Sequence, residues 1–113
     1  MKSRPVVALD VVREDVQAAY DYFTLRGASA GAHFLENYFA ITDRMAANPE
    51  FFPFKFDDYR RALVPQSYLA VYYFIEPERS VVVAVADARR HPPPHPRPCA
   101  RTQMIQFPDR FKP

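Results

Sequence analysis

The sequence is poor in cysteine and glycine. Its 113 residues include one cysteine, Cys99, and two glycines, Gly27 and Gly31. A single cysteine excludes an intramolecular disulfide and a cysteine-based metal cluster, and it suits a reducing compartment. Two isolated glycines exclude a glycine-rich phosphate-binding loop. The HExxH and CxxC motifs are absent too, so we expect neither a metal site, nor a cofactor, nor a small-molecule ligand.

Long apolar runs are also missing. No stretch approaches the ~20 residues that a membrane span requires. The N-terminal segment, MKSRPVVALDVV, carries Asp10 within its apolar part, so we expect no export signal. These two absences predict a cytoplasmic protein without a membrane association. The length fits one domain.

Basic residues are concentrated at the C-terminal end. Residues 1–88 carry nine Lys or Arg and twelve Asp or Glu, a net charge of −3, whereas residues 89–113 carry six and one, a net charge of +5. Such a segment either is a solvated tail or meets an acidic surface or nucleic acid. We expect a domain over 1–92, and a proline-rich tail over 93–113 that crosses its surface without joining the sheet. Within the tail, QMIQF at 103–107 has the composition of a short docking segment.

Apolar periodicity predicts an α+β fold. A strand over 5–12 precedes a helix over 15–26, which Asp15 caps and which ends at a left-handed Gly27. A second helix over 29–48 starts at Ser29, and Pro49 ends it. After a Phe-rich connector, strands follow at 59–64, 67–75 and 81–87. The order β-α-α-β-β-β places two consecutive helices on one face of a small, largely antiparallel sheet, with 81–87 as its central strand.

The second helix has a wide apolar face. At 100° per residue its apolar side chains fill an arc of roughly 160°. Two interpretations are open: the arc packs in the core, or part of it is left for a partner. The residues are Phe34, Leu35, Tyr38, Phe39, Ile41, Met45 and Ala46.

Arginines mark two of the predicted strands. Arg60 and Arg61 lie on one strand, and Arg89, Arg90 and His91 follow the end of another. If these strands are neighbours, the cations converge at one end of the sheet, where arginine binds carboxylates or phosphates. Alternatively, they form a solvated edge.

The arrangement resembles the RelE/ParE superfamily of toxins from type II toxin–antitoxin modules, which include plasmid stabilization systems. The resemblance covers residues 6–92. It rests on DVQAAYDYF, on AGAHFLENYFAI followed by NPE, and above all on YRRALVPQSYLAVYYFIEPERSVVVAVADARRHP. It implies the same β-α-α-β-β-β fold.

The resemblance implies one of two activities. RelE-like members cut messenger RNA on the ribosome without a metal, using basic residues and often a His or Tyr. ParE-like members bind and inhibit DNA gyrase. Cutters commonly carry an Arg just before the LVY of the third strand, where this chain has Leu69 in LAVY. We therefore favour the ParE-like, non-enzymatic activity; for a nuclease the catalytic candidates are Arg61, Arg89 and His91.

The resemblance also implies partners. Such toxins are neutralised by a cognate antitoxin that folds on binding. We expect it to contact Phe34, Tyr38, Ile41 and Met45, and the target to contact Arg60, Arg61, Arg89 and Arg90. A ribosome-dependent nuclease and a non-toxic protein of the same fold, which retains only antitoxin binding, remain the alternatives.

Overall fold

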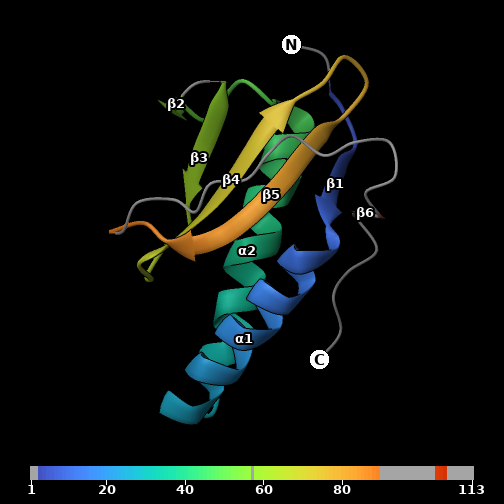
Figure 1. Cartoon of the computed structure of the whole chain (residues 1–113). Coiled ribbons are helices and arrows are strands. Elements are labelled where there is room, and N and C mark those ends of the chain that lie inside the picture. Colours follow the sequence, from blue (N-terminus) through green and yellow to red (C-terminus); the bar gives the residue numbers. More distant parts are fainter. Residues whose placement is uncertain (1–2, 57, 90–103, 107–113) are drawn as a thin grey trace.

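The computed structural model describes residues 3–56, 58–89 and 104–106, and among them it contains two helices and six strands (Figure 1). Neither helix has the length and apolarity that crossing a membrane requires. In chain order the elements are β1 (Val6–Leu9), α1 (Asp10–Arg26), α2 (Ala30–Ala47), β2 (Phe54–Phe56), β3 (Tyr59–Leu63), β4 (Leu69–Ile75), β5 (Ser80–Asp87) and β6 (Met104–Gln106).

The strands form one mixed sheet in the order β2-β3-β4-β5-β1-β6. β1 runs parallel to β5, and every other neighbouring pair is antiparallel. Figure 1 shows both helices on the same side of this sheet, with α2 behind β4 and β5. The predicted α+β class is therefore confirmed, and so is the internal position of β5 between two partner strands.

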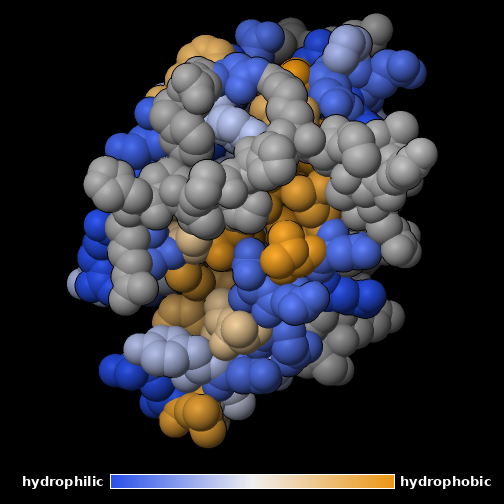
Figure 2. All heavy atoms as spheres, in the orientation of Figure 1, coloured by the Kyte–Doolittle hydropathy of each residue, from blue (hydrophilic) through white to orange (hydrophobic). Residues whose placement is uncertain are grey.

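β5 is internal because its sequence suits burial on both faces. From Ser80 to Val85 every residue is buried, as expected of a strand without an alternating polar face. Figure 2 shows apolar atoms gathered over β5 and the start of α1, with hydrophilic residues around them. The strand beside it, β4, contributes Tyr72, Tyr73 and Phe74, all fully buried.

The first helix starts earlier than predicted. α1 begins at Asp10, directly after the four-residue β1. The predicted first strand is therefore present but ends three residues earlier than expected, and the Asp15 cap is wrong. The run DVV continues the helical spacing that buries Val12 and Val16, and an acidic Asp10 in the first turn favours a helix start. Gly27 follows α1 with φ of −178°, which is extended and not left-handed, so that prediction is wrong as well.

The second helix follows its prediction closely. It starts after Ser29 and stops before Asn48 and Pro49. Gly31 lies at a close contact between the two helices, because a Cβ there would collide with Thr24 Oγ1 and lie 3.0 Å from the Tyr20 ring.

Two short strands lie where none was predicted. β2 forms within the Phe-rich connector and pairs with β3. β6 lies in the predicted tail and pairs with β1, so the expectation that the tail does not join the sheet is wrong. Three-residue strands have too short a pattern to be recognised by alternation, and both acquire their structure from a longer neighbour.

Candidate functional site

The predicted basic cluster does not form among the described residues. β4 lies between β3 and β5, and the antiparallel order places the start of β3 at the opposite end from the end of β5. Arg61 pairs with Tyr72, whereas Arg89 stacks on Tyr68, four residues away along the strand, or about 13 Å. Arg90 and His91 lie outside the described residues. The expected convergence at one sheet end is therefore wrong.

Arg60 has a structural role at the other end of the sheet. Its Nη1 donates to the backbone oxygens of Phe52 (2.8 Å) and Glu50 (3.3 Å), and its guanidinium lies 3.9 Å from the centre of the Phe54 ring. These contacts hold the Phe-rich connector against β3. Its neighbour Arg61 is partly exposed on the same strand.

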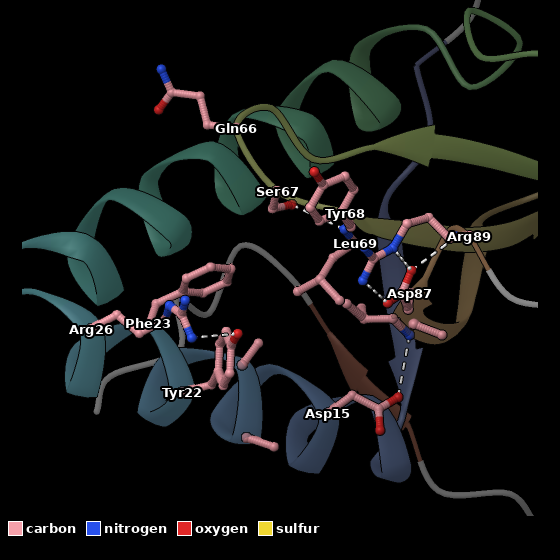
Figure 3. Close-up of a pocket in the computed structure, with 14 residues that line it drawn as sticks. Asp15, Tyr22, Phe23, Arg26, Gln66, Ser67, Tyr68, Leu69, Asp87 and Arg89 are labelled. Carbon is pink, nitrogen blue, oxygen red and sulfur yellow. Dashed lines mark hydrogen bonds and ion pairs between the residues drawn. The ribbon is translucent and has the colours of Figure 1, made fainter.

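A groove of about 810 Å³ lies between α1 and the adjoining ends of β4 and β5 (Figure 3). We call it the α1–sheet groove. Its floor is apolar and includes Phe23, Leu69 and Val85, and a Tyr–Arg pair lies on each rim. The volume is in the range of pockets that bind ligands or inserted side chains.

The helical rim carries Tyr22 and Arg26, one turn apart on α1. Arg26 Nη1 donates to the Tyr22 hydroxyl at 2.8 Å, and the guanidinium lies 5.0 Å from the centre of the ring. The Tyr22 side chain is nevertheless 54% exposed. The contact therefore orders an aromatic ring and leaves it accessible from solvent.

The sheet rim carries Tyr68, Asp87 and Arg89. Arg89 Nε and Nη2 donate to the two carboxylate oxygens of Asp87 at 3.0 and 2.7 Å, a bidentate pair. This hydrogen bonding to Asp87 raises the pKa of Arg89 above its ordinary value. The same guanidinium lies 3.9 Å from the centre of the Tyr68 ring, which is 64% exposed. The ion pair with Asp87 therefore holds the Arg89 guanidinium in position, and the guanidinium in turn orders the Tyr68 ring.

The charged residues that line the groove balance in sign. Among the described lining residues the charged side chains are Arg26, Arg89, Asp15 and Asp87, and these four contribute no net charge. A surface that binds a phosphate backbone needs a net positive charge. Ordered, exposed aromatic rings over an apolar floor are instead typical of surfaces that bind other proteins.

The four side chains predicted to bind an antitoxin fill the protein's own core. Phe34, Tyr38, Ile41 and Met45 are all buried within the chain. Burial also raises the pKa of Tyr38 above its ordinary value. The surplus apolar surface on which that prediction rested is therefore absent, and the simpler interpretation of the 160° arc, core packing, accounts for these residues.

The sequence contains one local pattern that indicates the helical rim of the groove. Tyr22 and Arg26 are spaced i, i+4, so they lie on one face of a helix. The contribution of Tyr68 has no such local signal, because it depends on the pairing of β4 with β5. Among the described residues no group of three His, Cys, Asp or Glu side chains is placed to hold a metal ion.

Comparison with known proteins leaves the groove as the main guide to function. The chain matches no protein-family model, and a search of curated proteins finds no similar sequence.

Proposed function

We propose that this chain is the toxin of a type II toxin–antitoxin module, of the ParE-like branch of the RelE/ParE superfamily. In this proposal it acts in the cytoplasm by binding a protein target, with DNA gyrase as the candidate, and a cognate antitoxin neutralises it. The order of elements supports the proposal, because β1, the two helices and the three-stranded meander β3-β4-β5 are what the resemblance implies, and the three-residue β2 is an addition to it.

The observation that carries the protein-binding activity is the α1–sheet groove. Its exposed rings, Tyr22 and Tyr68, are ordered by Arg26 and Arg89, and Arg89 is itself paired with the Asp87 carboxylate. Tyrosine and arginine are enriched among residues that dominate protein interfaces. The balanced charge of the groove's described lining residues does not favour the phosphates of messenger RNA.

The position of Leu69 supports the same choice. It lines the groove at the place where the resemblance expects the arginine of a nuclease. An arginine that stabilises a phosphoryl transition state contributes several kcal/mol in enzymes that use one. Leu69 has no donor with which to replace it.

Expression in a bacterial host tests the proposal directly. We expect growth arrest with an induced DNA-damage response and intact messenger RNA, and we expect the purified protein to inhibit gyrase supercoiling. Codon-specific messenger RNA cleavage on translating ribosomes would instead establish the nuclease. Absence of both effects, with a neighbouring gene product that still binds the chain, would identify a non-toxic protein of this fold.

A further inference from the structure

The strand β6 closes the edge of the sheet at β1. Met104, Ile105 and Gln106 pair antiparallel with Leu9, Ala8 and Val7, and β6 lies beside β1 in Figure 1. β1 is apolar and buried along its whole length. An uncovered strand of this kind presents unpaired N–H and C=O groups and is a template for pairing with another chain. The β1 edge is therefore an interaction surface, and the chain itself supplies the strand that occupies it.

The connection to β6 is much longer than the distance that it spans. β5 ends at Asp87 and β6 starts at Met104, so residues 88–103, sixteen in number, join them. β6 is two strands from β5, roughly 10 Å across the sheet, and Met104 lies roughly 13 Å along the strand from Asp87. Sixteen residues reach up to about 50 Å, more than the longest dimension of the molecule, 40 Å.

The sequence of this connection is rich in proline. Five of its sixteen residues are proline, at positions 92, 93, 94, 96 and 98. Proline fixes φ and stiffens a linker. A linker longer than the span between its ends lowers the effective concentration of the segment that it tethers, here β6 at the β1 edge of its own molecule.

We propose that β6 is exchanged between two copies of this chain, so that each β1 edge is closed by Met104–Gln106 of the other copy. The same ladder pairs form in the closed monomer and in the exchanged dimer. Exchange of an identical element therefore sacrifices no contact, and its main cost is the entropy of association. Short flexible linkers give effective concentrations on the order of millimolar, and longer linkers give less. The dimer therefore accumulates as the protein concentration approaches about millimolar. This inference is independent of the proposed toxin function.

A disulfide across the β1–β6 ladder distinguishes the two arrangements in the full chain. Leu9→Cys and Met104→Cys are introduced together with Cys99→Ser, which removes the native cysteine. Residues that face each other in an antiparallel ladder lie within the Cα separation that a disulfide spans. The protein is oxidised at about 10 µM and at about 1 mM, concentrations that bracket the linker's effective concentration, and is then denatured and separated without reductant.

We expect a covalent monomer at the lower concentration and at least a tenfold larger fraction of covalent dimer at the higher one. Peptide mapping should place the link of that dimer between positions 9 and 104. The two single-cysteine variants, each with Cys99→Ser, give the background of random cross-links. Val7→Cys with Gln106→Cys repeats the test if the first pair impairs folding. Covalent monomer alone at both concentrations, links that do not join the two strands, or a dimer no more abundant than in the single variants would each overturn the proposal.

Discussion

The carboxylate of Asp15 on α1 accepts a hydrogen bond from the main-chain N–H of Val85 on β5 at 3.2 Å, across a separation of seventy residues (Figure 3). β1 pairs with β5 only as far as Ala8 and Val82, so Val85 lies beyond the reach of the β1 ladder. Asp15 therefore satisfies a donor that the short β1 strand leaves without a ladder partner. A backbone donor buried without a partner is costly.

The Asp15→Ala variant should accordingly lose about 1–2 kcal/mol of unfolding free energy, because it leaves the Val85 N–H without this acceptor. Asp15→Asn keeps an oxygen in place and should lose less. Urea denaturation measures both. Asp21→Ala, which removes an exposed contact with Gln17 on the same helix, is the matched control and should change stability by under about 0.5 kcal/mol. Equal effects at positions 15 and 21 would contradict this role.

The two glycines should respond differently to alanine. Gly31→Ala should destabilise the protein by about 1–3 kcal/mol, because the added methyl group forces α1 and α2 apart at Thr24 and Tyr20. Gly27→Ala should be neutral or slightly stabilising, since its Cβ would meet only Ala30 at 3.8 Å and its backbone is extended. Thermal unfolding compares the two variants. A neutral Gly31→Ala would mean that the helices are not in close contact there.

The buried Tyr73 hydroxyl should make the unfolding free energy of the protein fall at high pH. Its hydroxyl donates to the Pro49 carbonyl at 2.6 Å, and burial raises its pKa from 10 to about 12. Since the folded pKa lies above the unfolded one, this group's contribution is complete below pH 10 and is lost between pH 10 and 12. Tyr73→Phe should cost about 1 kcal/mol at pH 8 and should flatten the alkaline decline. Tyr68→Phe, at an exposed ring, is the control, and an equal slope in both variants would contradict the assignment.

The aromatic rims should carry the binding of the target. Tyr22→Ala and Tyr68→Ala should each weaken target binding by at least about 2 kcal/mol if these rings are anchors, while the melting temperature changes by only a few degrees because both rings are exposed. Inhibition of gyrase supercoiling is the readout. Arg79→Ala, which breaks a partly exposed pair with Glu76 on the turn between β4 and β5, should have no effect. Full inhibition by both tyrosine variants would place the interface outside the groove.

Removal of β6 should expose the β1 edge. Deletion of residues 101–113 is expected to lower the melting temperature and to cause aggregation that increases with concentration, since β1 then lacks its outer partner. Ile105→Pro, which keeps the length and the charge of the chain, should act in the same direction because proline cannot donate to a ladder. Light scattering during heating measures both effects. A truncated chain with unchanged stability and solubility would show that β6 adds nothing to the sheet.

The parts of the fold that follow from local pattern were predictable. The half-exposed strand at Tyr59–Leu63, the unbroken apolar run over residues 81–86 and the Pro49 stop after α2 each correspond to an observed element. The first boundary was misplaced because VVALDVV is compatible with both periods, and only the length of the β1–β5 ladder decides between them.

The candidate site was less predictable because it depends on which strands are neighbours. Arg61 and Arg89 are both cationic and both close to strand ends, but the strand order places β4 between them. The apolar face of α2 could not be assigned from sequence either to the core or to a partner interface. Its burial depends on which other elements pack against the helix. The pairing of Tyr68 with Arg89 follows from the register of β4 with β5, which no short segment encodes.

The parallel pairing of β1 with β5 has a consequence for synthesis of the protein. Val6 pairs with Ser80, so β1 has no inner neighbour until β5, more than seventy residues later in the chain, has left the ribosome. Contacts between residues so distant in sequence form slowly, and a nascent chain that waits for them keeps apolar surface exposed. During translation α1 and α2 are complete long before the sheet. We therefore expect α1 and α2 to shield β1 from other nascent chains in this interval. Chaperone binding to the nascent chain should be greatest just before β5 emerges.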